Sequence, residues 1–234
     1  MKSTIRNKDK LVNTVFSRVY KKYDLMNDIA SLGIHRIWKN KLIDWMNPQF
    51  NESLIDVASG TGDIAKLFSK KNNNSSQITC VEPNDEMYSI GKSSLKSFKN
   101  IKWHKAKAEK LPFKNDTYNF YTISYGIRNV SDINLCLKEA LRVLRPGGRF
   151  MCLEFSKIDN EMIDLLYQKY SKIIPLVGKY IVGSSEPYDY LIKSINSFHT
   201  QDELKNLIKK NGFSNVEYRN LSSGISAIHS GWKI

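Results

Sequence analysis

Hydrophobic positions near the start of the chain recur every three or four residues, which is the spacing of one face of a helix. This spacing predicts one helix from Leu11 to Tyr23 and a second from Ile34 to Met46, where Pro48 ends the pattern. Lysines and arginines lie off the apolar faces of both segments. Residues 1–47 are therefore expected to form basic amphipathic helices.

After Pro48 the pattern changes to short apolar runs that alternate with helical patterns, as expected for a parallel sheet with crossover helices. The expected strands are Ser53–Val57, Gln77–Glu82, Ile101–His104, Tyr118–Ser124 and Gly148–Glu154. The helices between them are expected at Asp63–Ser69, Asp85–Leu95 and Asp132–Leu144, the last of which is closed by Arg145-Pro146-Gly147-Gly148. This order predicts a doubly wound α/β sheet.

The last third of the chain departs from this alternation. Residues 156–195 form a partly apolar, charge-balanced helical pattern, which we interpret as an inserted cap. A predicted helix at Gln201–Lys210 then precedes two predicted strands, Asn215–Asn220 and Ile225–His229, joined as a hairpin. Residues 48–234 are thus predicted to form one Rossmann-like domain, in which a mostly parallel sheet ends in an antiparallel hairpin.

Composition narrows the class of protein. The 234 residues are 41% hydrophobic, which fits one α/β domain with an appendage and excludes a disulfide mini-protein or a disordered tail. The net charge of +13 suits nucleic acid, an anionic membrane or an acidic partner, and equally a genomic bias toward lysine. No signal-peptide pattern and no run near the ~20 apolar residues of a membrane span occur, so we expect a cytoplasmic protein. Three dispersed cysteines in apolar contexts indicate a reducing compartment and no zinc site: Cys80, Cys136 and Cys152.

A glycine-rich turn follows the first predicted strand. Its Gly60-x-Gly62-x-x-Ala65 spacing fits a nucleotide-binding turn, and Glu82 ends the next strand where a ribose-binding carboxylate is expected. Two ligands compete for this pattern, because a dinucleotide presents an anionic pyrophosphate, whereas S-adenosylmethionine (SAM) presents a sulfonium and an α-ammonium. Asp56 and Asp63 would repel the dinucleotide and attract SAM. The turn therefore favours SAM over a nicotinamide cofactor.

Further motifs resemble a known family. Asp56–Asp63 resembles motif I of class I SAM-dependent methyltransferases, Ala108–Phe113 their loop after the third strand, and Leu141–Arg149 their segment before the fifth. Five more segments, in the same order, are similar to the ubiquinone/menaquinone biosynthesis C-methyltransferase family: Tyr23–Asp28, Gly33–Lys39, Thr122–Val130, Leu153–Lys157 and Asn220–His229. The resemblance covers about residues 15–233 and implies the class I SAM-methyltransferase fold.

The resemblance implies a SAM site built from the glycine turn and the ends of neighbouring strands, made of Asp56, Gly60, Thr61, Gly62, Glu82, Lys107, Ala108 and Ser124. Within it Glu82 would hold the ribose, and Lys107 and Ala108 would border the adenine. Three positions depart from the family's usual residues, namely Ser59 for Gly, Glu82 for Asp and Lys107 for Asn or Asp. Because a lysine cannot accept a hydrogen bond from the adenine amino group, that contact would fall to the backbone.

The resemblance also implies C-methylation of a polyprenylated hydroquinol ring, either 2-polyprenyl-6-methoxy-1,4-benzoquinol or demethylmenaquinol or both, with Arg128 and Asn129 beside it. A phenol has a pKa of about 10, so the site must favour its anion before the ring carbon can react. Arg128 would stabilise the phenolate, and Asn129 would orient the ring or a water. We expect a water to pass the proton to Asp63, with Tyr23 as an alternative orienting donor and no metal. His35 and His229 are expected to be packed residues rather than bases.

Partners and alternatives follow from the same features. Residues 1–47 hold ten Lys and Arg against four Asp, a net charge of +6, which predicts peripheral contact with an anionic inner membrane. The prenyl tail is expected to lie in an apolar channel under the cap, and a homodimer or a quinone-biosynthesis complex is compatible with the family. The main alternative is a SAM-dependent RNA methyltransferase, which the net charge would suit. However, this chain has Ser124-Tyr125-Gly126 where such enzymes have a Pro-Pro-Tyr/Phe element, and it has no Pro-Cys nucleophile. We therefore expect no nucleic acid partner. A nicotinamide-dependent oxidoreductase and a non-catalytic scaffold are the remaining alternatives.

Overall fold

A computed structural model of the chain describes residues 14, 17, 28, 31, 33–158, 161–162, 165, 167–170 and 186–234. Most of the predicted helix over residues 11–23, including the candidate Tyr23, lies outside the described residues, and so do residues 171–185 of the predicted cap. Among the helices that the structure does describe, none is long and apolar enough to cross a membrane.

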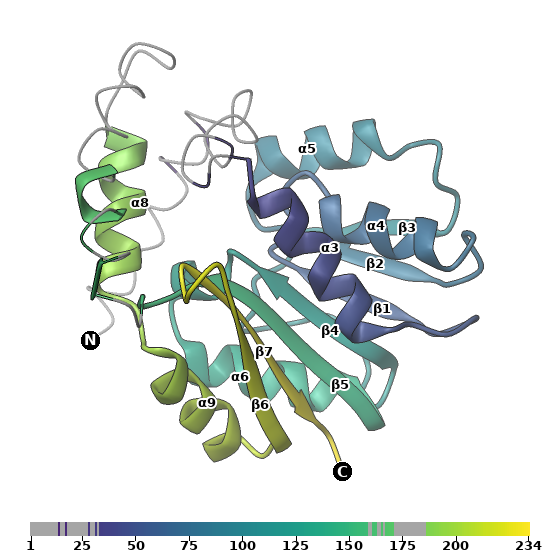
Figure 1. Ribbon diagram of the computed structural model, residues 1–234. Helices are drawn as coiled ribbons and strands as arrows, with labels where there is room; N and C mark the ends of the chain where they lie inside the picture. Colours follow the sequence, from purple (N-terminus) through teal and green to yellow (C-terminus); the bar gives the residue numbers. More distant parts are fainter. Residues whose placement is uncertain are drawn as a thin grey trace.

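The described strands form a seven-stranded sheet in the order β3-β2-β1-β4-β5-β7-β6 (Figure 1). Five strands are parallel: β1 (Leu54–Val57), β2 (Ile78–Val81), β3 (Ile101–His104), β4 (Tyr118–Ser124) and β5 (Leu144–Phe155). The last two, β6 (Ser214–Leu221) and β7 (Ser226–Trp232), form an antiparallel hairpin, and β7 pairs with β5. The predicted mostly parallel sheet with its terminal hairpin is confirmed. Because β1 pairs with both β2 and β4, the strand order reverses there, and such a reversal places a ligand crevice at the carboxyl ends of β1 and β4.

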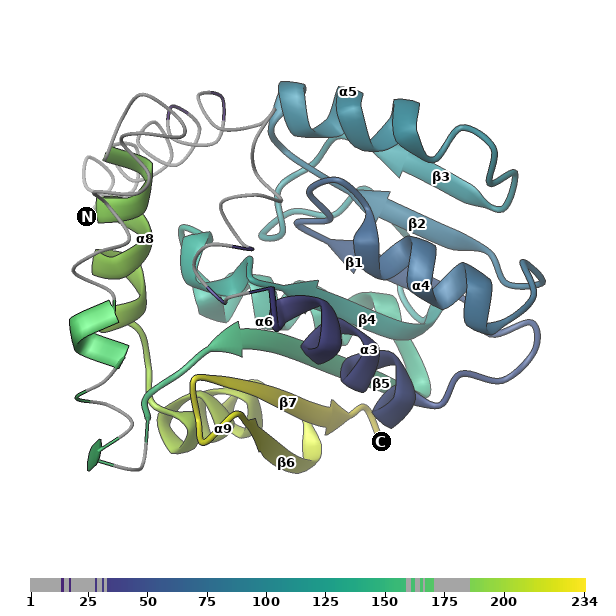
Figure 2. The same cartoon turned by 45° about the horizontal axis from the view of Figure 1, so that its top comes forward.

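Helices cover both faces of this sheet. On one face lie α3 (His35–Met46), α4 (Asp63–Lys71) and α5 (Asp85–Ser94), and on the other lie α6 (Ile133–Val143) and α9 (Gln201–Lys210) (Figure 1). Side-chain caps start several of them, since Asn84 accepts from the Met87 amide and Thr200 forms a capping box with Glu203. The 3₁₀ turn η2 (Ile127–Asn129) follows β4, and α8 (Glu186–Asn196) lies beside it. Figure 2 shows α8 standing at the end of the sheet rather than over a face.

Two apolar cores hold these layers together. Trp38 and Leu42 of α3 and Phe68 of α4 belong to the first core, beneath one face of the sheet. Leu137 of α6 and Ile208 of α9 belong to the second, beneath the other face. The amphipathic pattern of residues 34–46 therefore serves the core of the sheet domain, although these residues precede Pro48. The three cysteines are free and buried, as their apolar contexts predict.

Strand β5 begins earlier than the sequence predicts. The expected helix extends to Leu144 and the expected strand starts at Gly148, whereas Leu144 already pairs with Tyr118 in the sheet. The backbone N–H of Gly147 donates to Lys233 O over 2.8 Å, and the N–H of Lys233 donates to Gly148 O over 2.9 Å. The predicted start of the strand at Gly148 was wrong, because the chain already pairs with β4 at Leu144 and with the C-terminal segment at Lys233.

Candidate active site

The glycine turn after β1 is held in a left-handed backbone conformation. Ala58, Gly60 and Gly62 have φ values of 53°, 56° and 87°, and Gly62 is the residue that precedes α4. The turn is fixed to its neighbours, since the Ser59 amide donates to Val81 O over 3.1 Å and the Ser59 hydroxyl donates to Asp56 O over 2.6 Å. The polar side chain at Ser59, where the family usually has glycine, therefore ties the turn to β1.

Close packing restricts position 62 further. A Cβ added to Gly62 would lie 2.5 Å from Leu95 Cδ1 and 3.0 Å from Trp103 Cζ2. Only glycine combines this φ value with room for both neighbours. Packing therefore adds to the backbone conformation in requiring glycine at this position of the turn.

Glu82, the predicted ribose carboxylate, holds the turn in place. One of its oxygens accepts from the Gly60 amide over 2.9 Å, and the other accepts from the Asn84 amide over 3.0 Å. Burial raises the pKa of Glu82 to about 7, against the lowering effect of these two hydrogen bonds. Each carboxylate oxygen can accept a second hydrogen bond, so Glu82 has acceptor capacity for two ribose hydroxyls.

A cleft opens at the carboxyl ends of β1 and β4, where the sheet order reverses. Its lining includes five of the predicted site residues together with Lys39 and Tyr125: Asp56, Gly60, Thr61, Asp63 and Ser124. Lys107 and Ala108 lie beyond β3, where Lys107 O accepts from the Lys110 amide over 3.1 Å and Ala108 is buried. They follow β3, the second strand from β1 in the sheet, and are not among the described residues that line the cleft.

Asp56 is buried, and among the described residues only one of its two carboxylate oxygens has a hydrogen-bond partner. The Thr122 hydroxyl donates to Asp56 Oδ1 over 2.7 Å, while Oδ2 has no hydrogen-bond partner among the described residues, and the same is true of the buried Ser124 hydroxyl. Burial raises the pKa of Asp56 to about 7, which the Thr122 and Ser59 hydrogen bonds partly oppose. A buried carboxylate oxygen and a hydroxyl that line one cleft without partners fit a bound group that donates hydrogen bonds, such as an ammonium. The residues present therefore fit the methionine end of SAM.

Lys39 is a cleft residue that the sequence reasoning missed. Its side chain is 8% exposed and its Nζ lies 2.6 Å from Asp63 Oδ2. Burial raises the pKa of the Asp63 carboxyl, but the Lys39 ammonium outweighs that effect and the net pKa is lowered. The helical pattern places Lys39 off the apolar side of this helix, but α3 buries both Trp38 and Lys39 against the sheet and α4.

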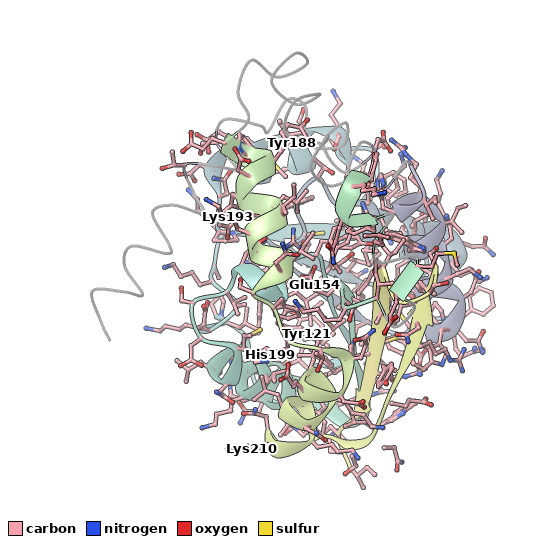
Figure 3. The ribbon with its side chains drawn as sticks, turned by 60° about the vertical axis from the view of Figure 1, so that its left-hand side comes forward. Tyr121, Glu154, Tyr188, Lys193, His199 and Lys210 are labelled. Carbon is pink, nitrogen blue, oxygen red and sulfur yellow. The ribbon has the colours of Figure 1, made fainter. Side chains whose placement is uncertain are left out.

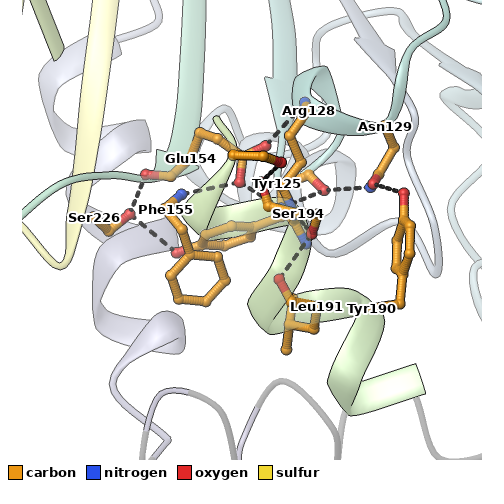
Figure 4. Close-up of polar contacts among 10 residues, drawn as sticks. Tyr125, Arg128, Asn129, Glu154, Phe155, Tyr190, Leu191, Ser194 and Ser226 are labelled. Atoms are coloured by element: carbon orange, nitrogen blue, oxygen red, sulfur yellow. Dashed lines mark hydrogen bonds and ion pairs between the residues drawn. The ribbon is translucent and has the colours of Figure 1, made fainter. Parts of the chain in front are cut away.

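The second polar cluster surrounds Arg128 on η2. Its guanidinium forms an ion pair with Glu154 at the end of β5, and both side chains are almost fully buried. Nη1 of Arg128 also donates to Tyr125 O over 3.0 Å, and Nε donates to the Ser194 hydroxyl over 3.3 Å (Figure 4). Burial raises the pKa of Glu154, against the lowering effect of the Arg128 charge. These contacts fix the position of the guanidinium at the carboxyl end of β4.

Asn129 is held by α8. The Tyr190 hydroxyl donates to Asn129 Oδ1 over 2.9 Å, and the Asn129 amide nitrogen donates to Tyr125 O over 3.4 Å (Figure 4). In Figure 3, α8 passes Glu154, with Tyr188 toward its first turn and Lys193 on its outer side. Helix α8 thus contributes polar side chains to Arg128 and Asn129 together.

Glu154, Tyr190 and Ser194 had no predicted role. Glu154 lies in the part of β5 from Phe150 to Phe155, whose other residues are apolar and buried, and a charged residue in such a run is a signal that sequence alone provides. Tyr190 and Ser194 lie four residues apart, on one face of α8, which becomes informative only once α8 is placed beside η2.

Both predicted packed histidines are buried. His35 Nδ1 lies 2.9 Å from the Ser31 hydroxyl and 3.6 Å from Asp28, a carboxylate partner that the sequence reasoning did not foresee. His229 Nε2 donates to Gln201 O over 2.9 Å. Burial lowers the pKa of each to about 4, so both imidazoles are neutral at pH 7.

A mostly parallel sheet with this strand order and a C-terminal antiparallel hairpin, a glycine turn after β1 and a carboxylate at the end of β2, is the fold of class I SAM-dependent methyltransferases. Solved structures share it. A possible histamine N-methyltransferase from Thermotoga maritima matches with a TM-score of 0.67 at 20% identity, covering 94% of this chain and 99% of that one. A putative methyltransferase of Haloferax volcanii, solved with its Trm112 activator, matches with a TM-score of 0.65 at 13% identity, covering 90% and 97%.

The chain belongs to the ubiE/COQ5 methyltransferase family, whose sequence pattern matches residues 4–233. It is 49% identical to the "Ubiquinone/menaquinone biosynthesis C-methyltransferase UbiE" of Rickettsia bellii over 97% of this chain and 94% of that protein. It is 48% identical to the protein of the same name in Rickettsia prowazekii, over 96% and 93%. The resemblance drawn from the motifs is confirmed.

Proposed function

We propose that this protein transfers the methyl group of SAM to a ring carbon of a polyprenylated hydroquinol in ubiquinone or menaquinone biosynthesis. The observation that carries the proposal is near-half identity, over almost the full length, to relatives named for this C-methylation. The cleft supports it, since Asp56 and Ser124 hold buried polar atoms without partners where the methionine end of SAM would bind. The alternative of an RNA methyltransferase is not favoured, because these relatives are named for quinone biosynthesis.

In the proposed site the described residues divide into two groups. Glu82 would accept the ribose hydroxyls, Asp56 would accept from the α-ammonium, and the turn at Gly60–Gly62 would contact the nucleoside. When bound, SAM supplies an electrophilic methyl group for an in-line displacement, which requires the ring carbon to be held opposite the sulfur. Arg128 and Asn129, at the carboxyl end of the adjacent strand β4, would hold the ring.

Arg128 would lower the cost of forming the phenolate. A guanidinium held rigidly by Glu154, Tyr125 and Ser194 needs no rearrangement when negative charge develops on the ring oxygen. Asn129, fixed by Tyr190, would orient the ring hydroxyl or a water. The buried pair with Glu154 means that Arg128 would act through oriented N–H groups more than through net charge.

The phenolic proton requires an acceptor. We propose that a water passes it to Asp63, which lines the cleft and whose lowered pKa keeps it ionised. Glu154, which pairs with Arg128 on the ring side, is the second candidate acceptor, and burial raises its pKa. The dependence of the methyl-transfer rate on pH distinguishes the two candidate proton acceptors. If the fall in rate at acidic pH disappears in Asp63→Asn, the result supports Asp63 as the acceptor. If it disappears in Glu154→Gln, the result supports Glu154.

The hydroquinol's tail would lie beneath the predicted cap, in which α8 already contacts η2. Cross-linking from a quinol with a photoreactive prenyl tail should then label residues of 156–195. Labelling confined to the outer face of α6 or α9 would contradict a cap-covered channel.

We also propose that the basic residues of 1–47 draw the protein to anionic lipid. Two of them are already neutralised within the fold, since Lys39 pairs with Asp63 and Arg36 pairs with Asp28, so fewer than the ten basic residues would face lipid. Co-sedimentation with anionic vesicles should weaken as salt rises, because surface charge is screened. Binding that is absent or unaffected by salt would contradict this.

The test of the function is a methyl-transfer assay with radiolabelled SAM and two short-tailed acceptors, demethylmenaquinol and 2-prenyl-6-methoxy-1,4-benzoquinol. The proposal expects label in at least one quinol, and loss of that label in Arg128→Ala. Label in a co-incubated RNA pool, with none in either quinol, would contradict it.

A further inference from the structure

The cleft contains one basic side chain that the methyl transfer described above does not use. Resting on the proposed function, we propose that Lys39 binds the carboxylate of SAM's methionine end, while Asp56 receives the α-ammonium. Lys39 would thereby be a specificity-determining residue for ligands that carry an amino-acid carboxylate.

The position of Lys39 supports this role. Its side chain is 8% exposed, it lies on α3, and its Nζ reaches across to Asp63 at the first turn of α4. Lysine is rarely buried unless its charge is used, because removing an ammonium from water is costly. An ammonium has three donors, and the contact with Asp63 uses one of them, so Nζ has the capacity to bind a second oxygen.

The charges in the cleft match those of SAM. Among the described side chains that line it, Asp56 and Asp63 are the acids and Lys39 is the base. With both acids ionised the lining carries one net negative charge, while SAM carries a sulfonium, an ammonium and a carboxylate and is a net cation of one charge. The ligand's single anionic group would face two aspartates if Lys39 were absent, and like charges at close range are unfavourable.

The local fold explains how a lysine comes to face inward. The Trp38 indole is buried and its Nε1 donates to the Ser222 hydroxyl over 3.1 Å, which fixes the rotation of α3 about its axis. With that rotation the next residue, Lys39, points toward α4 and the glycine turn. Lys41, two residues further along, is exposed.

A purely structural role for Lys39 is the competing explanation, since the Lys39–Asp63 pair also joins α3 to α4. The two roles differ in what a ligand series detects. A structural lysine affects all ligands of the cleft equally, whereas a carboxylate-binding lysine affects only ligands that carry the carboxylate.

The experiment is isothermal calorimetry with three probes: S-adenosylhomocysteine, its decarboxylated analogue, and 5′-methylthioadenosine, which lacks both the ammonium and the carboxylate. We expect the wild-type protein to bind S-adenosylhomocysteine roughly tenfold or more tightly than the decarboxylated analogue, as for a charge-assisted hydrogen bond. Lys39→Met should reduce that ratio to within about twofold and leave 5′-methylthioadenosine binding unchanged. Lys41→Met, the exposed control on the same helix, should retain the full ratio.

Two outcomes overturn the inference while leaving the proposed function standing: equal binding of S-adenosylhomocysteine and its decarboxylated analogue by the wild type, or an undiminished ratio in Lys39→Met. The first needs no variant, so it decides the matter even if Lys39→Met fails to fold. Failure of the wild type to bind S-adenosylhomocysteine at all would overturn both the inference and the proposed function.

Discussion

The guanidinium of Arg128 and the carboxylate of Glu154 form an ion pair inside the protein, with 5% and 2% of their side chains exposed. The pair connects η2, at the carboxyl end of β4, to the end of β5. Removing one partner of a buried pair leaves an uncompensated charge, which costs far more than loss of a surface pair.

Glu154→Gln should therefore affect both stability and methyl transfer. We expect the free energy of unfolding to fall by about 3 kcal/mol and the turnover number to fall about 100-fold, because the guanidinium loses its fixed orientation. Urea titration and the methyl-transfer assay measure these two quantities. The matched control is Asp44→Asn, which breaks the exposed pair with Lys71 and should cost less than about 1 kcal/mol. Equal effects of the two substitutions would contradict a special role for the buried pair.

Gly62→Ala should destabilise the glycine turn more than its backbone conformation alone explains. Both Gly62 and Gly147 have positive φ values, of 87° and 76°, but a Cβ at Gly62 would lie 2.5 Å from Leu95 whereas one at Gly147 meets nothing within 4 Å. Alanine at either position costs about 1 kcal/mol for the left-handed backbone, and at Gly62 overpacking adds roughly 1–3 kcal/mol. Thermal unfolding of the two variants gives the comparison, and equal losses would show that the packing of Leu95 and Trp103 does not constrain the turn.

The sequence predicted the elements whose signals are local. Strands β3 and β4 and helix α9 have the predicted bounds. Short apolar runs mark the two strands, and the Thr200 cap marks the start of the helix, so each signal lies within a few residues. The two carboxylates that line the cleft, Asp56 and Asp63, were also singled out from the sequence, because they flank the glycine turn.

What the sequence did not reveal depends on partners far apart in the chain. The first residue of β5 pairs with Tyr118 of β4, and the next turn bonds to Lys233. Trp38, which precedes the buried Lys39, contacts Ser222, and Glu154 pairs with Arg128 from the neighbouring strand end. A basic residue in an amphipathic helical pattern is normally expected to face water. Only the packing of α3 on α4 shows that Lys39 is buried.

Ligand binding should depend on pH through Asp56. Its pKa in the free protein is about 7 because of burial, and a bound ammonium would favour the ionised carboxylate and so lower that pKa. The affinity for S-adenosylhomocysteine should consequently increase as the pH rises from 5.5 to 7, by at most about tenfold per pH unit for each group that titrates. Glu82, whose pKa is also about 7, contributes in the same direction, so Asp56→Asn should reduce the slope without abolishing it. Calorimetry across this range tests the prediction, and a flat wild-type profile would contradict it.

Stability in acid should depend on His229. Burial lowers its folded-state pKa to about 4, below the unfolded value of about 6.5, so the unfolded chain binds more protons between these limits. Stability is then full above about pH 6.5 and decreases as the pH falls toward 4, by up to about 1.4 kcal/mol per pH unit from this residue. Its Nδ1 is buried without a partner among the described residues, so the protonated ring would bury an unsatisfied N–H.

Urea unfolding between pH 4.5 and 7.5 measures this dependence. His229→Gln, which keeps a donor for Gln201 O, should reduce the slope by about one proton, whereas His104→Gln at the exposed end of β3 should leave it unchanged. An unaltered slope in His229→Gln would show that other groups control acid stability.

The central claim, methylation of a hydroquinol ring carbon, is tested most directly by locating the transferred methyl group. The protein is incubated with ¹³C-methyl SAM and reduced short-tailed demethylmenaquinol or 2-prenyl-6-methoxy-1,4-benzoquinol, and the product is examined by NMR. We predict a single labelled methyl bonded to a ring carbon, formed by the wild type and not by Arg128→Ala. A label on a ring oxygen, or no labelled quinol despite tight binding of S-adenosylhomocysteine, would contradict the claim.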